Sequence, residues 1–371
     1  QLGWFEENKI NEPNLAEYLD IVALGTVADV VPLDKNNRIL VKEGLRRIRA
    51  GQCVKGITAL LEASGREPTQ IIASDLGFAI GPRLNAAGRL DDMSVGIECL
   101  LADSDTAYQL AHQLDSLNRD RREIETDMKM EALQALEQMQ LSADSIFGLA
   151  MYDESWHQGV IGILASRIKD KIHRPVIIFA PGDDGEIKGS ARSIKGIHIR
   201  DVLEAISTAH PGMIKKFGGH AMAAGMTIDA GNFEKFKHQF NEHVKIIANE
   251  EILENIILSD GELSREEYTL ETVELLEQGG PWGQEFPEPV FSGSFKVVSQ
   301  RVLKEKHYKL VISPENDSKL MLDGIAFNQL EGNEVLDSRM LPDKIDVVYK
   351  LSINNFRGQR NLQLMIDRIF A

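Results

Sequence analysis

Three things are scarce in this 371-residue chain: cysteine, positive charge and long apolar runs. Its two cysteines, Cys53 and Cys99, form no CxxC pair, which argues against a zinc site and a disulfide framework and fits a reducing, cytoplasmic location. No apolar run approaches the ~20 residues that a membrane-spanning helix needs. The first residues also lack the basic-then-apolar pattern of a signal peptide. We therefore expect a cytoplasmic protein with no membrane partner.

The 41 Lys and Arg residues are outnumbered by 57 Asp and Glu residues, and the formal net charge is −16. So acidic a chain is not expected to coat nucleic acid without selectivity, because the phosphate backbone would repel most of its surface. A narrow basic cleft remains compatible with this charge. Binding in such a cleft would be selective for strands that can thread it and would depend on salt.

The chain shows no internal repeat and no low-complexity tract, and its length predicts two or three domains. Four segments differ in pattern: a mostly helical segment, one long charged helix, an alternation of strands and helices, and an acidic connector followed by short β-rich runs. They cover residues 1–102, 103–140, 141–250 and 251–371. Because the chain starts abruptly and without Met, we expect it to begin partway through a domain.

Two stretches of the first segment are expected not to be helical. Residues 21–33, IVALGTVADVVPL, are interpreted as an apolar strand between two helices, and residues 81–92, GPRLNAAGRLDD, interrupt the later helical pattern. From 103 to 140 the chain has no Pro or Gly, and apolar residues recur at helical spacing. So long and charged a helix is typical of a connector between domains.

Alternation of strands and helices begins near residue 146, which predicts an α/β domain. Strands are expected at 147–152 and 174–180 on either side of a helix at 159–172, and residues 226–249 add one strand and one helix.

The last segment predicts a small OB-type β-barrel. Its acidic connector, residues 250–280, is expected to be helical, and the Pro-rich stretch 281–289 indicates a boundary. The five expected strands are residues 290–300, 307–313, 321–327, 345–351 and 362–369.

The strongest candidate site is KFGGHAMAAG at residues 216–225. Two glycines before a histidine, followed by small residues, make a poor core strand or helix start, but they leave the backbone open to a phosphate or nucleotide. A second polar turn, KGSARS, lies at residues 188–193. A lone histidine is more often structural, yet this combination favours an anion site. Its expected members are Ser190, Arg192, Gly218, Gly219 and His220.

Asp29 is a candidate metal ligand. It lies in the apolar run at 21–33, and the carboxyl end of a strand in an α/β domain is the usual place for such a ligand. The alternative is a turn or helix-cap aspartate, because no DxD or paired histidine lies nearby to complete a metal site.

Arg83 and Arg89 are candidate phosphate ligands, since guanidinium groups suit bidentate contacts with oxyanions. The alternative is a structural loop held by the two aspartates that follow. His157 is expected near the start of a helix, where backbone N–H groups favour anions. The neighbouring Trp156 could stack on a base, although a packed tryptophan is the commoner case.

Two basic clusters with aromatic residues are expected on loops of the barrel. The first contains Lys306 and Tyr308, and the second, NNFRGQRN at residues 354–361, contains Arg357. Such loops hold single strands without reading their sequence. The alternative is a pair of solvated hairpin turns.

Together these motifs resemble the RecJ family of bacterial single-strand-specific exonucleases, within the DHH phosphoesterase superfamily. The resemblance spans nearly the whole chain in the family's order. The matching motifs are LGTVADVVPL at 24–33, GPRLNAAGRLDD at 81–92, WHQGVIGILASR at 156–167, GSARS at 189–193, KFGGHAMAAG at 216–225 and GPWGQEFPEPVF at 280–291.

The resemblance implies an α/β fold with four parts. These are the C-terminal part of a DHH catalytic domain (1–102), a long connecting helix (103–140), a DHHA1 domain (141–250), and a helical connector with an OB nucleic-acid-binding domain (251–371). It implies 5′→3′ hydrolysis of single-stranded DNA to mononucleotides in recombination and repair. The implied partners are single-stranded DNA, a single-strand-binding protein and a RecQ-type helicase.

In that family, Mn²⁺ or Mg²⁺ is held by a DxD motif, a further aspartate and the DHH motif. This chain lacks those motifs, and only the last metal-binding aspartate is present, as Asp29. A two-metal hydrolase holds its ions ~4 Å apart, which one carboxylate cannot do. We therefore expect the parent protein to be a nuclease and this chain alone to be inactive.

The resemblance also implies roles for the other candidates. Arg192 and Ser190 would bind the terminal phosphate, and His220 would contact the scissile or adjacent phosphate and stabilise developing charge. Arg83 and Arg89 would guide the strand. Two alternatives stay open: a DHH phosphoesterase acting on short oligonucleotides or cyclic dinucleotides, and a non-catalytic single-strand-binding or adaptor protein.

Overall fold

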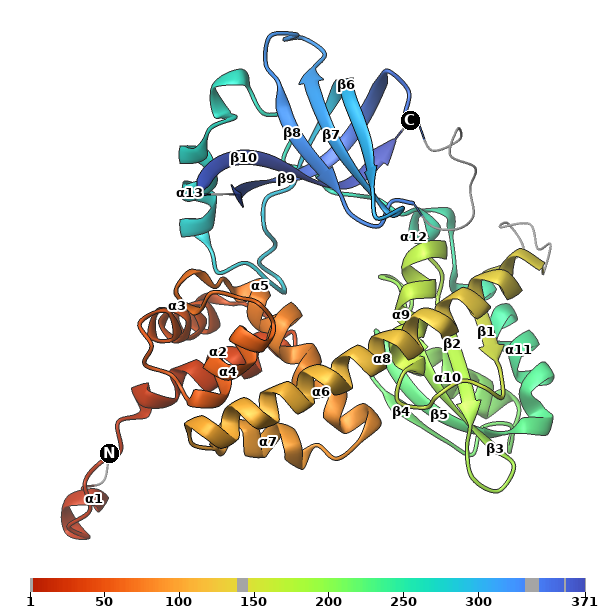
Figure 1. Ribbon diagram of the computed structural model, residues 1–371. Coiled ribbons are helices and arrows are strands. Elements are labelled where there is room, and N and C mark those ends of the chain that lie inside the picture. The colour runs from red at the N-terminus through yellow and green to blue at the C-terminus, as the bar shows by residue number, and fades with distance from the viewer. Residues whose placement is uncertain (1–2, 139–145, 331–339, 357, 371) are drawn as a thin grey trace. The chain divides into compact units, whose positions relative to one another are not determined.

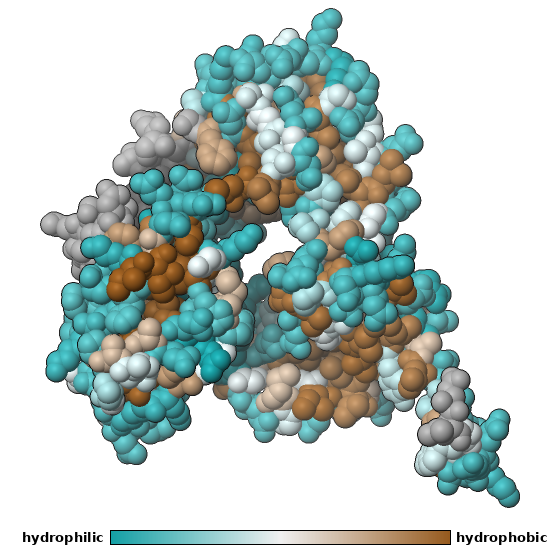
Figure 2. Space-filling view, turned by 180° about the vertical axis from the view of Figure 1, so that it is seen from behind, coloured by the Kyte–Doolittle hydropathy of each residue, from teal (hydrophilic) through white to brown (hydrophobic). Residues whose placement is uncertain are grey.

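The computed structural model describes residues 3–138, 146–330, 340–356 and 358–370. The chain divides into two compact units, one made of residues 1–53, 69–78 and 257–371 and the other of residues 54–68 and 79–256 (Figure 1). Among the described helices, none is both long and apolar enough to cross a membrane. Hydrophilic residues cover most of the face seen in Figure 2, with apolar patches scattered among them.

The first unit combines short helices with a closed β-barrel. Its helices are α1 (Trp4–Glu7), α2 (Leu19–Ala28), α3 (Lys35–Arg49), α5 (Ala73–Asp75) and α13 (Leu270–Gly279). Its strands are β6 (Phe291–Leu303), β7 (His307–Pro314), β8 (Leu322–Ala326), β9 (Lys344–Phe356) and β10 (Gln359–Phe370), paired in the order β10-β8-β7-β6-β9. All five barrel strands were predicted, and buried residues alternate with less buried ones most regularly along β7 and β8.

The second unit joins helices to a five-stranded sheet. Its helices are α4 (Lys55–Ala63), α6 (Gly81–Leu90), α7 (Ser94–Leu101), α8 (Ser104–Gln138), α9 (Ile161–Ile172), α10 (Ile199–Ala209), α11 (Phe233–Ile247) and α12 (Glu250–Leu253). Its strands are β1 (Leu149–Tyr152), β2 (Val176–Pro181), β3 (Glu186–Arg192), β4 (Lys216–Gly219) and β5 (Ala223–Asp229), in the order β1-β2-β3-β5-β4.

The predicted long helix is confirmed as α8, but one side of it is buried rather than solvated. Ala107, Ala111 and Leu114 are fully buried in its first half. Further along, Met128 and Ala132 join the apolar cluster between α8, α9 and the sheet. The helix is therefore part of two cores, and it ties the helical part of the second unit rigidly to the sheet.

The predicted strand at residues 21–33 is wrong, because Leu19–Ala28 form helix α2. Its β-branched residues favour a strand, but the buried residues Asp20, Ala23 and Leu24 lie on one helical face. That face packs so closely on α3 that a Cβ on Gly44 would lie 2.2 Å from the Leu19 carbonyl oxygen. Tertiary packing here outweighs local propensity.

The predicted interruption at residues 81–92 is also wrong, since Gly81–Leu90 form helix α6. Pro82 lies in the first turn, where a helix tolerates proline because the missing N–H has no helical partner there. The preceding residues 76–80 form a π-helical turn. Gly and Pro therefore indicate the start of a helix at this point rather than a loop.

The two polar turns predicted around the candidate site are strands. Lys188 and Ser190 lie in β3, and the glycines of the GGH motif lie in the edge strand β4. Small residues are required because the strands approach closely: a Cβ on Gly219 would lie 2.3 Å from the Ala223 carbonyl oxygen.

The connector at 250–280 is helical only over α12, a 3₁₀ turn at Arg265–Glu267 and α13. Between them the backbone pairs with the start of the barrel, where the Asp260 N–H donates to the Val290 carbonyl at 2.7 Å and the Ser292 N–H to that of Gly261 at 3.0 Å. This part of the connector therefore packs as part of the barrel.

Candidate anion-binding site

A cradle of polar groups lies where helix α9 begins beside strand β3. A Cβ added to Gly162, in the first turn of α9, would lie 2.9 Å from Arg192 Nη2 and 3.0 Å from Ser190 Oγ. Only glycine leaves room for these two side chains to lie against the helix start. Val160, the N-cap residue, makes no side-chain cap among the described residues. The dipole at the start of α9 therefore adds positive potential beside Arg192, although the N–H groups of Val160, Ile161 and Ile163 already donate to backbone carbonyls.

Two arginines approach this cradle without a carboxylate partner. Arg192 Nη1 donates to Ser190 Oγ at 3.1 Å and to the Ala191 carbonyl at 2.8 Å, and Arg89 Nη1 donates to the Gly159 carbonyl at 3.1 Å. Within the described part of the chain, neither forms an ion pair within 4.0 Å.

The electrostatics of the two arginines favour an anionic ligand. Burial and then the charge of Arg89 lower the pKa of the Arg192 guanidinium. Burial lowers the pKa of Arg89 as well, and Glu125 opposes that shift. Two guanidinium groups that repel each other and are partly removed from water are stabilised by an anion between them.

The sheet beside Ser190 presents a surface almost without side chains. Ser190 faces Gly225 on β5, and Gly225 faces Gly218 on β4, so the three residues form one row across the sheet. A Cβ on either glycine would meet none of the described atoms within 4 Å. These two glycines are therefore not required by packing, and the open row allows a ligand to lie flat against the backbone.

Two exposed histidines, His157 and His220, lie on turns of the same unit. The Gly159 N–H donates to His157 Nδ1 at 3.0 Å, and the Met222 N–H donates to His220 Nδ1 at 3.3 Å. In the neutral ring these contacts place the proton on Nε2, because Nδ1 accepts. Each Nε2–H then points away from its own turn as a potential donor to a ligand.

Arg83 and Trp156 have structural contacts. Arg83 is buried and uses all three guanidinium nitrogens: Nε and Nη2 contact Asp115 Oδ1 at 2.9 and 2.7 Å, and Nη1 donates to the Ala79 carbonyl at 2.7 Å. The Trp156 indole donates to Glu131 Oε2 at 2.9 Å. Trp156 is therefore packed, as its alternative expected. Arg83 also has a structural role, but in helix α6 and through Asp115 rather than in a loop held by Asp91 and Asp92.

Asp29 does not form a metal site with the other residues that the structure describes. It is exposed at the C-terminal end of α2, as a helix-end residue. Among the residues that the structure describes, no three His, Cys, Asp or Glu side chains are grouped to hold an ion. The donor set present therefore does not fit a Mn²⁺ or Mg²⁺ centre.

On the barrel, Lys306 and Tyr308 lie in different environments. Lys306 is exposed beside the two-residue turn of Lys304 and Glu305, which both adopt positive φ. Tyr308 is only 5% exposed and packs in the barrel core, so its ring is not available to a strand. Arg357 lies outside the described residues.

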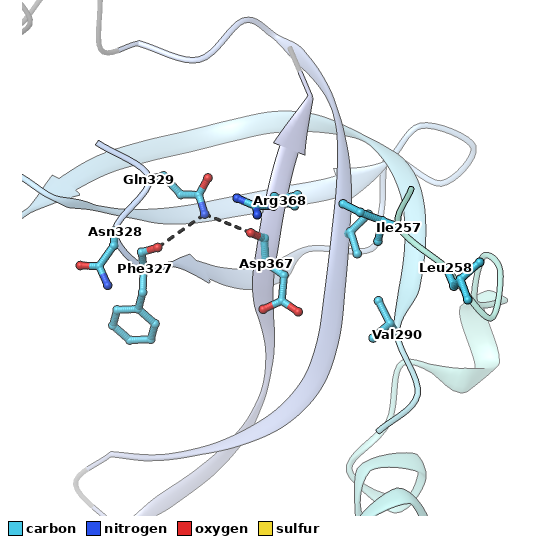
Figure 3. A pocket seen from close by; sticks show the side chains of 9 residues that line it. Ile257, Leu258, Val290, Phe327, Asn328, Gln329, Asp367 and Arg368 are labelled. Carbon is cyan, nitrogen blue, oxygen red and sulfur yellow. Dashed lines mark hydrogen bonds between the residues drawn. The ribbon is translucent and has the colours of Figure 1, made fainter. Parts of the chain in front are cut away.

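Phe327 is a surface aromatic that the sequence interpretation missed. It is 47% exposed, and its ring stands edge-on to His307 with centroids 5.2 Å apart. It borders a hollow of about 500 Å³ whose other lining residues come from the segment after β8, from β9 and β10, and from the stretch before β6 (Figure 3). Gln329 Nε2 closes one side by donating to the Phe327 and Asp367 carbonyls at 3.5 and 3.1 Å.

The chain is similar to proteins of one family over nearly its whole length. Two family models match: the DHHA1 domain over residues 144–246 and the RecJ OB domain over residues 259–368. The single-stranded-DNA-specific exonuclease RecJ of Dickeya dadantii is 54% identical over 376 residues, covering 100% of this chain and 64% of its own length. The Escherichia coli protein of that name is 54% identical over 374 residues, covering 99% and 63%.

Solved structures show the same fold. RecJ from Thermus thermophilus in complex with Mg²⁺ has a TM-score of 0.79 and 28% identity, covering 98% of this chain and 53% of its own. Its Mn²⁺ complex has a TM-score of 0.80 and 28% identity, covering 99% and 51%. The chain thus spans less than two thirds of the length of these relatives.

Proposed function

This chain belongs to the RecJ family, and from that premise we propose that it is the strand-holding part of a single-strand-specific 5′→3′ exodeoxyribonuclease that acts in DNA recombination and repair. The ligand in this proposal is the 5′ end of single-stranded DNA. Phosphodiester hydrolysis belongs to the longer parent protein.

The observation that carries the proposal is the pair Arg89 and Arg192, two half-buried arginines with no carboxylate partner among the described residues. A 5′-terminal phosphate fits this pair, because its oxygens can accept from both guanidinium groups and from the Ser190 hydroxyl. The open row of Gly218 and Gly225 then gives the following nucleotides a flat surface. His220 would donate from Nε2 to the scissile or adjacent phosphate, and His157 would donate near the start of α9.

Catalysis requires metal ligands that the described residues of this chain do not bring together. RecJ from Thermus thermophilus has been solved in complex with Mg²⁺ and with Mn²⁺. Such ions activate water and stabilise the leaving oxygen. Asp29 is proposed as one ligand of that centre, with the others supplied from outside this chain. The isolated chain is therefore expected to leave single-stranded DNA intact in the presence of Mn²⁺, and chelator-sensitive degradation would contradict this.

The barrel is proposed to hold the strand further from the 5′ end. Lys306 and Phe327 are exposed on neighbouring parts of its surface, and a cation beside an exposed aromatic ring is a combination that binds single strands without sequence preference. Tyr308 supports this surface from the core.

The test is binding of the 371-residue chain to one oligonucleotide carrying either a 5′ phosphate or a 5′ hydroxyl. We expect preference for the phosphate, and Arg192→Ala should weaken that binding by roughly 30-fold while leaving the 5′-hydroxyl strand nearly unaffected. Arg46→Ala is the matched control, because Arg46 is exposed and paired with Glu43 in the other unit.

Equal binding of both ends, unchanged by Arg192→Ala, would overturn the 5′-end assignment. Binding of single strands that depends on Lys306 and Phe327 alone would instead favour a non-catalytic single-strand-binding role. A comparison of a long strand with a dinucleotide would separate the strand-binding function from a phosphoesterase for short oligonucleotides.

A further inference from the structure

One carboxylate of the long helix, Glu125, lies between two arginines. Its Oε2 accepts from Arg121 Nη1 at 2.8 Å, and its Oε1 accepts from Arg167 Nε at 2.9 Å. The Glu125 side chain is only 12% exposed. Because Arg121 is on α8 and Arg167 is on α9, this carboxylate connects the long helix to the helix that carries the cradle at its N-terminal end.

Glu125 lies close enough to the cradle to act on one of its arginines, Arg89. Arg89 contacts Gly159, and Arg192 lies against Gly162, three residues further along the chain. Burial lowers the pKa of Arg121, Glu125 opposes that shift, and Arg122, Arg89 and Arg167 add to it. Glu125 is also the carboxylate that acts on Arg89. The guanidinium groups of Arg89, Arg121 and Arg167 therefore share Glu125 as a counter-charge, and Arg192 is coupled to them through Arg89.

This region also keeps polar atoms without partners in the described structure. Arg121 Nε and Asn118 Nδ2 are buried and unpaired, although Arg121 Nη2 donates to Asn118 Oδ1 at 2.9 Å. Buried donors without acceptors and uncompensated positive charge both raise the free energy of the empty site. A bound anion relieves the charge, and so does Glu125, which means that the two compete.

We propose that Glu125 is a positioning residue that limits how tightly the arginine cradle holds phosphate. Its charge offsets the repulsion among the arginines when no ligand is bound, and it repels a phosphate that arrives. This inference rests on the proposed function. An exonuclease must release each terminal phosphate before the strand can advance, and a cradle with no carboxylate would retain it.

The test compares Glu125→Gln with Glu131→Gln in the full chain. Glutamine keeps the length of the side chain and one acceptor oxygen but removes the charge. Glu131 is a matched control, because it also lies on α8 and also contacts the α/β part, but through the neutral Trp156 indole. The readouts are affinity for a 5′-phosphorylated oligonucleotide as salt is raised, and melting temperature with and without inorganic phosphate.

We expect Glu125→Gln to bind the phosphorylated strand about fivefold more tightly at low salt, with the gain shrinking as salt screens it. Its ligand-free melting temperature should fall and recover when inorganic phosphate is added. Glu131→Gln should show neither the tighter binding nor the recovery. Affinity for Glu125→Gln that equals or falls below that of Glu131→Gln overturns the inference.

Two further variants separate the possible failures. Glu125→Asp keeps the charge and shortens the side chain, so affinity should stay within about twofold of the wild-type chain. A role in bracing alone predicts that Asp and Gln behave alike. If Arg192→Ala leaves phosphate binding unchanged, the proposed function fails. If Arg192→Ala weakens binding but Glu125→Gln does not tighten it, only the role of Glu125 fails.

Discussion

The two basic surfaces of this chain differ in how their charges are compensated. On the barrel, several exposed cations are paired with carboxylates: Arg360 with Glu274 at 2.8 Å, and Lys344 with Glu315. In the α/β part, Arg89 and Arg192 are half-buried and have no such partner among the described residues.

This difference assigns different work to the two surfaces. Exposed pairs contribute roughly 0–1 kcal/mol each and weaken with salt. Half-buried arginines without carboxylates are costly until an anion arrives, and screening by salt affects them less. The α/β part is therefore suited to recognising one defined phosphate, and the barrel is suited to weak contacts spread along a strand.

The largest effect should come from comparing alanine variants of two arginines of α6, one without a carboxylate partner and one paired with Asp115. Arg83 and Arg89 lie six positions apart around α6, and both were candidate phosphate ligands. Arg89→Ala should weaken binding of a 5′-phosphorylated strand by roughly 30-fold with little loss of stability. Arg83→Ala should lower the free energy of unfolding by about 3 kcal/mol, because it leaves the half-buried Asp115 with only the exposed Arg119 at 3.3 Å as a partner.

Denaturant unfolding and binding titrations on both variants check this prediction. The 5′-hydroxyl strand serves as the control ligand. If Arg83→Ala abolished the phosphate preference while the fold stayed as stable as the wild-type chain, the distinction between the two arginines would be wrong.

Much of the fold could be predicted from the sequence because long periodic patterns are reliable. The barrel strands and α8 follow from periods of 2 and 3.6 residues. The errors fell where short patterns are ambiguous. Ile21 and Val22 favour a strand, but packing of α2 on Gly44 makes them helical. Around Pro82, glycine and proline suggested a loop where a helix begins.

Some residues of the candidate site could be predicted from the sequence, and others could be recognised only from the structure. Ser190 and Arg192 could be picked from the sequence because they lie close together in one unusual motif. No local pattern could separate Arg83 from Arg89, since the partner of Arg83 is Asp115, 32 residues away. Gly162 is informative only once α9 and β3 are seen together. The burial of Tyr308 could be predicted from the sequence, because Tyr308 lies on the same inward face of the strand as Leu310 and Ile312.

A smaller effect should follow from filling the open row of the sheet. Gly218→Val adds a side chain where no described atom lies within 4 Å, so stability should change by less than about 0.5 kcal/mol. Strand binding should fall by roughly tenfold, because the branched side chain occupies one end of the open row formed by Ser190, Gly225 and Gly218. Gly231→Val is the control, as Gly231 is equally open but lies outside the row. Unchanged binding by Gly218→Val would remove the sheet face from the binding surface.

The smallest effect is expected on the barrel, where one variant removes an exposed aromatic side chain and another removes a buried one. Phe327→Ala should weaken binding of a long single strand by about fivefold, corresponding to about 1 kcal/mol for loss of one stacked base, with the fold intact. Tyr308→Ala should instead lower the free energy of unfolding by about 3 kcal/mol, as expected when a buried aromatic is removed. Fluorescence titration with short and long strands checks the first variant, because only the longer strand should lose affinity if the barrel contacts nucleotides far from the 5′ end. Equal losses of affinity for both strands would place Phe327 beside the 5′ end. They would contradict the proposal that the α/β part binds the terminal phosphate while the barrel binds more distant nucleotides.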